Sequence, residues 1–506
     1  MEKIKLSKNK ENFGLTFSDS NYKEFKETRN KNLFENVIDS LMMNKYSDNE
    51  ELNNYIKGLP NDKKRIALLT TLDGNNNQWN KLKQLVDNKK SITDNIKEII
   101  LMLRKFVKVG EVEKKKYGEV MTPLELVKDM LANLPKDVWS NPNLKWLDPA
   151  NGTGPFPIMV IYKLMEGLKE WEPNEEKRYK HIVENMIYTC ELQDRNVFLW
   201  LCAVDLEDRY ATNTYWGSFL EEEFDNHVKE VWRVDKFDII LGNPPYNGAE
   251  TGGGNSLWDK FIRKSILYIK SGGNLVFVHP SSWRKPPSDR SKTKDIWKLL
   301  THKNQLIYLE IHSIDDGKKV FNAGTRYDFY CVEINEKYKK SIVIDENGNK
   351  NIIDCGDWEF LPNYNFNNIK KLMGNGCEVI FSRSMYATDK TGISDKRTDE
   401  YKYPLIHSTP KSGIRYKYCN ENRGHFGVSK IIFGESGINH VIIDTKGDYG
   451  ITNSSIGIKI NSIEEATSLK NYLLSEYFKD IIKSCSWGNF RIDWRLFKYF
   501  KKDFWK

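Results

Sequence analysis

Residues 237–246 read Phe-Asp-Ile-Ile-Leu-Gly-Asn-Pro-Pro-Tyr. The apolar run predicts a buried strand over 237–241, and a proline turn follows it directly. Two prolines stiffen this turn and remove backbone donors, which leaves carbonyl oxygens and the Asn243 side-chain oxygen as acceptors beside an aromatic ring. Such a turn suits a planar amine that donates two hydrogen bonds. The candidate acceptors are therefore Asn243 Oδ1 and the Pro244 carbonyl, with Tyr246 stacking on a base.

A second polar segment lies upstream at 148–156, Asp-Pro-Ala-Asn-Gly-Thr-Gly-Pro-Phe, after a predicted strand at 145–147. Gly152 and Gly154 would let a ligand approach the backbone, and Asp148 offers a carboxylate to a cationic or hydroxylated group. The spacing fits neither G-x-G-x-x-G nor the P-loop pattern, which argues against a dinucleotide or ATP. A plain tight turn is the alternative interpretation.

A third candidate is Glu191, which ends the predicted strand 186–190. A carboxylate at the tip of the next strand can accept hydrogen bonds from both hydroxyls of a ribose. In isolation, an ordinary solvated carboxylate explains Glu191 as well. Together with Asp148, it favours a nucleoside-containing cofactor that carries an ammonium group.

The region 117–340 alternates short apolar runs with amphipathic helical stretches. The predicted strands are 145–147, 186–190, 237–241, 274–279 and 305–311, with 329–333 near the far edge, and the predicted helices include 157–168 and 257–269. Strands joined by helices predict an α/β fold with a doubly wound, Rossmann-like parallel sheet. In such a sheet, ligands bind outside the carboxyl ends of the strands.

Three domains are expected in this 506-residue chain. Residues 1–110 show helical apolar spacing and predict a helical N-terminal domain. Residues 111–350, which contain the three candidate segments, are expected to form a catalytic domain. Residues 351–506 predict a separate α+β domain, with β-rich segments such as 430–433 and 441–443 and a helix at 463–474.

Composition narrows the class of protein. The formal net charge is +8, and the segment from Asp357 onward contains 23 basic and 17 acidic residues. This excess permits a nucleic-acid partner without requiring one. The seven scattered cysteines favour a reducing, cytoplasmic environment and argue against a zinc site, so we expect no metal. No apolar stretch is long enough to cross a membrane, so we expect no membrane association.

The order of these motifs carries a family resemblance. Thr122-Pro123, the 148–156 segment, Glu191 and the proline turn at 243–246 follow one another in this chain. This order resembles the amino-methylating (N6-adenine) DNA methyltransferases of the γ arrangement, including those of restriction-modification systems. The resemblance covers 117–340 well and the C-terminal third loosely. It implies S-adenosyl-L-methionine as cofactor and methyl transfer to the N6 amine of a flipped-out adenine in double-stranded DNA.

The resemblance also implies roles for individual residues. Thr122 would contact the methionine part of the cofactor, and Glu191 would contact the ribose. The methionine end would be held by a group of residues around the glycine turn: Asp148, Ala150, Gly152 and Gly154.

One segment departs from the family pattern. Where the family usually has Gly-Asp-Phe beside the cofactor adenine, this chain has Gly217-Ser218-Phe219. Ser218 can still hydrogen-bond and Phe219 can still pack, but the carboxylate is missing. Asp205 is a distant candidate to replace it. Tyr327 is expected to offer a second aromatic ring to the flipped base, although packing in the core explains it equally well.

Two segments interleave cations with aromatics, as nucleic-acid contacts often do. For the strand at 411–418, which contains Arg415 and Lys417, we favour contact with DNA. For the tail at 487–498, a terminal helix that packs its aromatics inward is the favoured interpretation. We expect a monomer, and a cognate restriction endonuclease is a candidate partner. The alternatives are an RNA or protein (glutamine) methyltransferase and the methylating part of a restriction-modification enzyme; the recognition sequence stays open.

Overall fold

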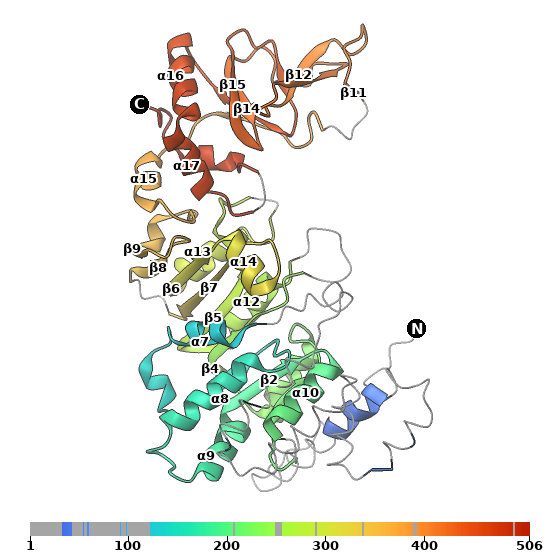
Figure 1. The fold of residues 1–506 in the computed structure, drawn as a ribbon, viewed down its shortest axis with the longest axis vertical. Helices are drawn as coiled ribbons and strands as arrows, with labels where there is room; N and C mark the ends of the chain where they lie inside the picture. The colour runs from blue at the N-terminus through green and yellow to red at the C-terminus, as the bar shows by residue number, and fades with distance from the viewer. Residues whose placement is uncertain are drawn as a thin grey trace.

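The computed structural model describes part of the chain. The described residues are 33–42, 54, 58–59, 92, 98, 122–205, 208–247, 256–288, 291–335, 339–387, 392–488 and 491–506. Figure 1 shows an elongated molecule, with a large sheet in its lower part and two smaller sheets at its C-terminal end. In the part described, no helix is long and apolar enough to cross a membrane.

A nine-stranded sheet forms the centre of the predicted catalytic domain, in the order β3-β2-β1-β4-β5-β7-β6-β8-β9. We call it the catalytic sheet after this prediction. The strands are β1 (Trp146–Asp148), β2 (Ile187–Glu191), β3 (Asn213–Trp216), β4 (Phe237–Gly242), β5 (Ile269–Pro280), β6 (Gln305–His312), β7 (Tyr327–Glu333), β8 (Ser341–Ile344) and β9 (Lys350–Ile353). Strand β1 pairs in parallel with both β2 and β4. The strand order therefore reverses at β1 and β4, which is where an α/β sheet binds its ligands.

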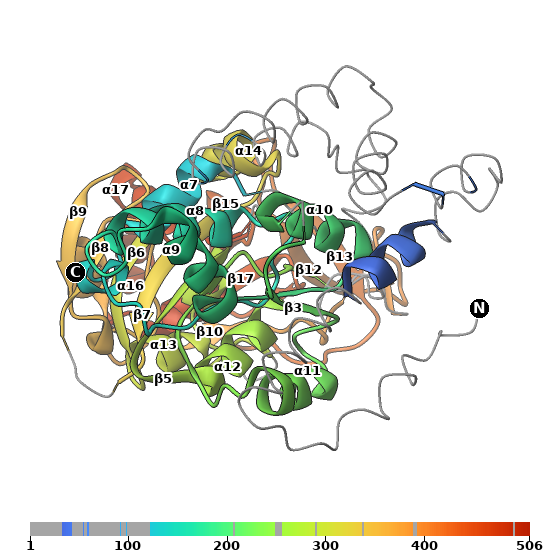
Figure 2. The same cartoon turned by 90° about the horizontal axis from the view of Figure 1, so that it is seen from below.

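Successive residues of the central strands point to opposite faces of the sheet. In β4, Ile240 joins one hydrophobic cluster, and Ile239 and Leu241 join the other. The helices lie in two layers on these faces (Figure 2). One layer contains α7 (Leu124–Leu131), α8 (Pro155–Gly167), α9 (Glu175–His181) and α10 (Asp194–Asp205); the other contains α11 (Glu222–His227), α12 (Trp258–Tyr268) and α13 (Ile296–Thr301). The predicted doubly wound α/β fold is confirmed.

The sheet differs from the prediction at β7, which is neither parallel to its neighbours nor near the far edge. It lies between β5 and β6 and is antiparallel to both. The connection from β6 carries only the short helix α14 (Ile314–Phe321), so the chain turns back beside β6 instead of crossing over the sheet. As a result, β7 begins at the edge where the parallel strands end, and Tyr327 pairs with Pro280 and His312.

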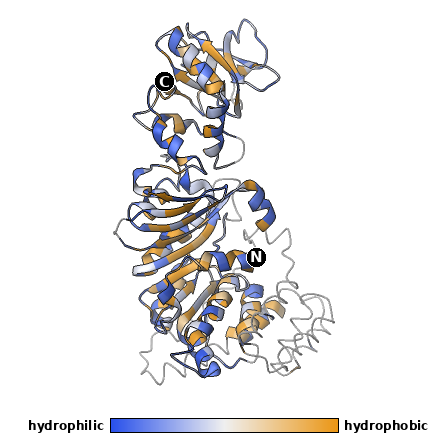
Figure 3. Ribbon diagram, turned by 60° about the vertical axis from the view of Figure 1, so that its left-hand side comes forward, coloured by the Kyte–Doolittle hydropathy of each residue, from blue (hydrophilic) through white to orange (hydrophobic). Residues whose placement is uncertain are grey.

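The C-terminal region contains two four-stranded sheets (Figure 1). The first is β10 (Val379–Ile380), β17 (Ser455–Lys459), β14 (Lys430–Gly434) and β15 (Gly437–Asp444); the second is β11 (Ile393–Ser394), β13 (Arg415–Cys419), β12 (Tyr403–Ser408) and β16 (Gly450–Ile451). The helices here are α15 (Phe366–Leu372), α16 (Ile463–Leu474) and α17 (Glu476–Ser484). Figure 3 shows mainly apolar residues along the central strands and a mixture of polar and apolar residues along the helices. The predicted domain boundaries stay a prediction.

Short helical turns complete the described elements: η2 (Lys136–Trp139), η3 (Ile182–Met186), η4 (Val228–Trp232), η5 (Ser281–Arg284), η6 (Cys355–Asp357) and η7 (Trp494–Tyr499).

A helix over residues 33–42 packs against α10. Its buried Val37 and Leu41 follow the predicted helical spacing, and the ring of Phe34 lies edge-on to Phe198 at 5.8 Å. Ser40 Oγ also donates a hydrogen bond to Asp194 Oδ2 at 2.8 Å. Most of the predicted N-terminal helical domain lies outside the described residues.

A buried arginine, Arg284, joins the catalytic sheet to the C-terminal region. The Arg284 and Asp328 side chains are both fully buried, and Nε and Nη2 of Arg284 donate to the two carboxylate oxygens at 2.7 and 2.9 Å. Arg284 Nη1 also donates to the carbonyls of Leu361 and Pro362, and Nη2 donates to Asn363 Oδ1 at 3.0 Å. We call these residues the Arg284 network.

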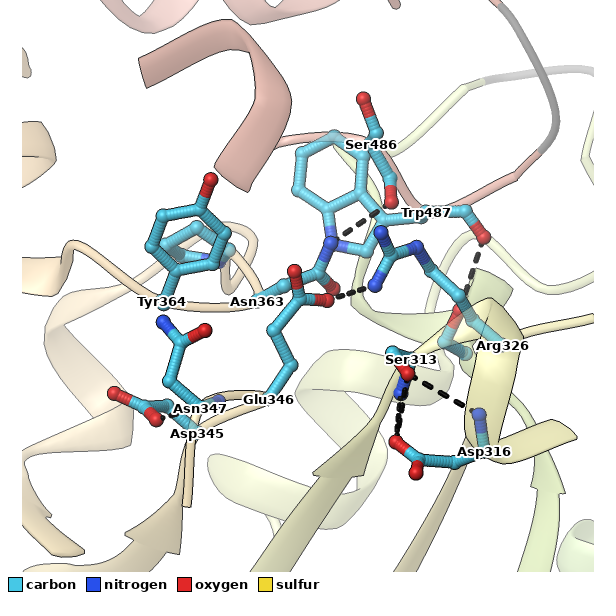
Figure 4. Close-up of polar contacts among 12 residues, drawn as sticks. Ser313, Asp316, Arg326, Asp345, Glu346, Asn347, Asn363, Tyr364, Ser486 and Trp487 are labelled. Carbon is cyan, nitrogen blue, oxygen red and sulfur yellow. Dashed lines mark hydrogen bonds and ion pairs between the residues drawn. The ribbon is translucent and has the colours of Figure 1, made fainter. Parts of the chain in front are cut away.

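Neighbouring contacts extend this junction (Figure 4). Arg326 pairs with Glu346, and both side chains are nearly buried. Ser281 Oγ donates to the carbonyl of Trp487 at 2.9 Å, so the residues after α17 return to the end of β5. The catalytic sheet and the C-terminal region are thus connected through buried polar contacts as well as apolar packing.

Removing one partner of the Arg284 network should destabilise the protein strongly. We expect Asp328→Asn to lower the free energy of unfolding by about 3–5 kcal/mol, because it leaves the buried Arg284 charge uncompensated. Urea denaturation followed by tryptophan fluorescence measures this loss. As the control, Glu166→Gln removes an exposed pair with Lys169 and should change the stability by less than about 1 kcal/mol. A loss for Asp328→Asn as small as the control's would contradict the expectation.

Candidate active site

The proline turn after β4 is held by Thr122. Asn243 Nδ2 donates to Thr122 Oγ1 at 3.0 Å, and Thr122 is only 3% exposed. This contact leaves Asn243 Oδ1 as a buried acceptor without a hydrogen-bond partner among the described residues. The predicted acceptor is therefore free to receive a donor, and the predicted Thr122 lies directly beside it. Residues 117–121, which adjoin Thr122 in the sequence, lie outside the described part of the chain.

Tyr246 lies in the same turn. Its ring is half-buried, and its buried hydroxyl lies beside the Asn243 side chain. Burial raises the pKa of Tyr246 well above its ordinary value, so the hydroxyl stays protonated. Pro244, between Asn243 and Tyr246, is buried. The turn thus places an aromatic ring beside the unpaired Asn243 Oδ1; the stacking of Tyr246 on a base stays a prediction.

Asp148 lies at the adjacent end of β1. Its Oδ1 accepts a hydrogen bond from the Ala150 amide at 3.0 Å, while its buried Oδ2 has no partner among the residues described. Burial raises the pKa of Asp148 to about 8, and the nearby charge of Glu191 adds to the shift. Among the residues that the structure describes, no cation pairs with this carboxylate. The geometry therefore suits a ligand that brings a positive charge.

The ends of β1 and β4 touch at Gly242. This residue has φ of +154°, and a Cβ there would lie 2.8 Å from Asp148 Oδ1. A larger residue at 242 would therefore push the Asp148 carboxylate away from the proline turn. The unpaired oxygens of Asp148 and Asn243 consequently belong to adjoining strand ends.

The glycine turn is tied to β2 by Glu191. Glu191 Oε2 accepts from the Gly152 amide at 2.8 Å, and Oε1 accepts from the Gln193 amide at 2.8 Å. Gly152 has φ of +54°, and a Cβ there would meet no atom within 4 Å, so this side of the turn is open. Gly154 has φ of +90° and lies against the Trp200 ring, where a Cβ would clash. Gly152 therefore leaves one side of the turn open to a ligand, and Gly154 makes room for the Trp200 ring.

Asn151 also belongs to this site, although no role was predicted for it from the sequence. Asn151 is 1% exposed, and its Oδ1 is buried without a partner in the described residues. The backbone amide of Asn151 donates to the Cys190 carbonyl at 2.9 Å, which places this residue between the ends of β1 and β2. A carboxamide side chain between two small residues, in the sequence Ala-Asn-Gly, was the available signal.

The Gly217-Ser218-Phe219 segment is only partly as predicted. The Gly217 amide donates to the Glu191 carbonyl at 2.9 Å, so the segment does lie at the end of β2. Ser218 Oγ accepts from the Leu220 amide at 3.2 Å. Phe219 is 1% exposed and stacks on Phe261 at 5.3 Å, which places its ring in the core.

Asp205 was wrong as a substitute for the missing carboxylate. It ends α10, which runs back from the end of β2 towards the start of β3, so it lies at the opposite edge of the sheet. Its two carboxylate oxygens accept from the amides of Arg209 and Tyr210 at 2.8 and 2.6 Å. Burial raises its pKa to about 6, and its role is to hold the turn after α10.

Tyr327 is enclosed by aromatic neighbours. It is 1% exposed, stacks on His312 at 4.3 Å and meets Phe321 edge-on at 4.8 Å. It lies close enough to Tyr246 to contribute to the raised pKa of that residue. The structure thus brings Tyr327 near the proline turn, while contact with a base stays a prediction.

Arg415 and Lys417 lie on β13, in the C-terminal sheets and away from the ends of β1 and β4 (Figure 1). Arg415 is exposed, whereas Lys417 Nζ forms an ion pair with Asp395 at 2.6 Å. The structure does not bring these two residues to the Asn243 turn. Their predicted contact with DNA stays a prediction, and the Lys417 charge is already matched by a carboxylate.

The raised pKa of Asp148 predicts a pH dependence of stability. Between an unfolded pKa of about 4 and a folded pKa of about 8, the folded state holds one more proton than the unfolded state, so stability from this group falls as pH rises. We expect the free energy of unfolding of Asp148→Asn to fall less than that of the original protein between pH 5 and 8. Urea denaturation at several pH values measures the difference, and the exposed Asp137→Asn serves as control. Parallel curves for the original protein and Asp148→Asn would contradict the expectation.

Comparisons with known proteins bear on the same region. Residues 169–321 match the family model described as Eco57I restriction-modification methylase. A protein of Mycoplasma pneumoniae described as an uncharacterized adenine-specific methylase is 28% identical, over 33% of this chain and 55% of that protein. The chain thus spans about half the length of the curated relative that it matches.

Solved structures of restriction-modification enzymes are also similar. The type IIL enzyme MmeI in complex with DNA is 11% identical with a TM-score of 0.47, covering 80% of this chain and 70% of that chain. A nuclease-deletion mutant of the type ISP enzyme LlaGI, in complex with a DNA substrate mimic, is 11% identical with a TM-score of 0.47, covering 90% of this chain and 55% of that chain. TM-scores below 0.5 support no conclusion about activity. The match over residues 169–321 confirms the resemblance to restriction-modification methylases that the order of the motifs predicted.

Proposed function

We propose that this chain is a site-specific DNA methyltransferase that transfers a methyl group from S-adenosyl-L-methionine to the N6 amine of a flipped-out adenine. One observation carries the proposal. Asn243 Oδ1 and Asp148 Oδ2 are buried acceptors without a donor among the described residues, and they belong to adjoining strand ends. Buried polar atoms in folded proteins are nearly always hydrogen-bonded, so two such acceptors at one place favour a ligand with N–H donors.

The residues at the end of β1 fit the methionine part of this cofactor. Asp148 has an unpaired buried carboxylate oxygen and a raised pKa, and an ammonium group would supply the missing charge and hydrogen bond. Asn151 offers a second acceptor nearby. Glu191, which holds the glycine turn through the Gly152 amide, is the proposed contact of the ribose hydroxyls. When bound, S-adenosyl-L-methionine supplies a sulfonium methyl group that an amine can attack.

The Asn243 turn would prepare the amine. The lone pair of an adenine amine is delocalised into the ring, which makes it a poor nucleophile. Asn243 Oδ1 and the Pro244 carbonyl would each accept one amine hydrogen, which favours the pyramidal nitrogen that can react. Thr122 fixes the side-chain amide so that the oxygen and not the nitrogen faces the amine. After methylation the surplus amine proton leaves to water, so no side chain is required as a base.

Double-stranded DNA is the proposed substrate because the match is to restriction-modification methylases. An adenine must leave the duplex to reach a protein site, and the protein must hold the duplex during that step. We propose the C-terminal region, 351–506, as the target-recognition domain, since its two sheets are distinct from the catalytic sheet. A cognate restriction endonuclease stays a candidate partner.

The Asn243 acceptor is tested by its removal. We expect Asn243→Ala to lower the rate of methyl transfer by about 10²–10³-fold or more, since one hydrogen bond that acts on the reacting group contributes this much. The assay uses tritiated cofactor and unmethylated duplex DNA, followed by nucleoside analysis for N6-methyladenine. The surface residue Asn133 provides the control Asn133→Ala. Unchanged turnover in Asn243→Ala, or a methylated cytosine as the product, would refute the proposal.

Asp148 is tested by cofactor binding. We expect Asp148→Ala to weaken the binding of S-adenosyl-L-methionine by roughly 10- to 100-fold, in keeping with the loss of a charge-assisted hydrogen bond. Isothermal titration calorimetry measures this affinity in the absence of DNA. Asn243→Ala should retain near-original cofactor affinity in the same experiment. Equal affinity of Asp148→Ala and the original protein would remove Asp148 from the cofactor site.

A further inference from the structure

We propose that a basic surface at the junction of the catalytic and C-terminal regions binds the phosphate backbone of duplex DNA. The proposal rests on the proposed function and names a surface that would hold the substrate. The surface is defined by five cations: Lys285, Arg383, Arg491, Arg495 and Lys498. We call it the junction surface.

An aromatic pair forms the centre of this surface. Phe381 and Trp494 are half-buried and stack with their ring centroids 4.9 Å apart and an interplanar angle of 19°. The Arg383 guanidinium lies 5.9 Å from the Phe381 ring, and Lys498 Nζ lies 4.8 Å from the Trp494 ring. The two cations therefore occupy fixed positions on one platform although they are far apart in the sequence.

The backbone holds the two segments together. The Cys377 amide donates to the Phe497 carbonyl at 3.1 Å, and the Gly374 amide donates to the Tyr499 carbonyl at 2.8 Å. Phe497 itself is fully buried. The tail thus packs part of its aromatic surface inward, as the sequence favoured, while Arg383, Arg491 and Lys498 stay exposed.

The cations of the junction surface outnumber the carboxylates beside them. Asp493 is already bound by Arg495 through Nε at 2.8 Å. The buried Glu435 lies 3.3 Å from Arg491, and burial raises its pKa while Arg491 and Arg383 act in the opposite direction. In the described part of the chain, Lys285, Arg383 and Lys498 have no ion pair.

Lys285 extends the surface to the catalytic sheet. It follows η5, which follows the end of β5, so it lies at the edge of the sheet that also carries Asn243. A Cβ on Gly488 would lie 3.5 Å from Lys285 Nζ, which places this lysine against the tail. Burial lowers the pKa of Lys285; the Asp493 charge raises it and the Arg495 charge lowers it further. A phosphate would supply this half-buried ammonium group with a negatively charged partner.

A phosphate backbone fits these features better than a base edge does. Arg491 and Arg495 each pair with one carboxylate, whereas Lys285, Arg383 and Lys498 have no ion pair in the described part of the chain. Separate, unpaired cations suit contacts that fix a duplex by its phosphates, and each neutralised phosphate releases counterions. Lys417, the cation predicted from sequence, is in contrast matched by Asp395. The unpaired cations of the junction surface therefore carry the stronger electrostatic argument.

The test measures duplex affinity against salt. The double variant Arg383→Ala/Lys498→Ala is compared with the original protein by fluorescence anisotropy, using two duplexes of unrelated sequence in 0.05–0.3 M KCl (roughly the range over which phosphate contacts are lost). We expect the affinity for both duplexes to fall about tenfold or more at low salt, and the slope of log K against log[KCl] to become shallower by about 2, one unit for each cation removed. Lys136→Ala, an exposed lysine of η2 before β1, should leave both quantities unchanged.

Several outcomes decide the proposal. Unchanged affinity and slope would overturn it, and so would a loss confined to one duplex, because that result indicates base recognition. The conservative variant Arg383→Lys/Lys498→Arg should retain most of the affinity, and cofactor binding by the alanine variant should match the original protein, which shows that it is folded. If the original protein binds and methylates DNA while the alanine variant binds equally well, only the junction surface is refuted. If the original protein binds neither duplex, the proposed function fails as well.

Discussion

The close contact between the ends of β1 and β4 is the constraint on which the rest of this structure depends. These two strands are neighbours at the point where the strand order reverses. The helices that follow them leave the sheet on opposite faces, and a space opens between these helices. Because Gly242 has no side chain, the Asp148 carboxylate has room beside the end of β4. The acceptor of the proline turn and the carboxylate of the glycine turn are thereby fixed by the sheet and not by flexible loops.

Without a ligand, the unpaired oxygens at these positions destabilise the folded protein. An unpaired buried oxygen gives up its hydrogen bonds to water without replacement, which destabilises a protein by about 1–3 kcal/mol for each group. Asp148, Asn151 and Asn243 each contain such an oxygen. Functional sites often contain groups that destabilise the free protein, because a bound ligand completes the interactions of these groups. The concentration of three such groups around β1 and β4 therefore separates this site from the well-satisfied Arg284 network.

Much of the fold could be predicted from local sequence because the parallel strands are buried on both faces. The run at 237–241 and its neighbours are nearly continuous in apolar residues, and the turns that follow them contain the glycines and prolines that mark strand ends. The antiparallel insertion of β7 could not be predicted in this way, since register and neighbour order depend on contacts between distant segments. Asp205 was misjudged for the same reason: its sequence shows a carboxylate after a helix, but not at which edge of the sheet that helix ends. The position of Lys417 beside Asp395 likewise depends on the pairing of β11 with β13.

The Arg284 network has a consequence for how this architecture can vary. Arg284 Nη1 binds the carbonyls of Leu361 and Pro362, which are backbone groups present whatever side chains stand there. Within the described part of the chain, Asn363 is the one residue beyond the catalytic sheet whose side chain contacts the guanidinium. A different C-terminal module could therefore attach to the same catalytic sheet provided that it presents two carbonyls and one amide at this position. Because most of this contact is made by backbone groups, the sequence of the C-terminal region could change while the nine-stranded sheet and the ends of β1 and β4 stay the same.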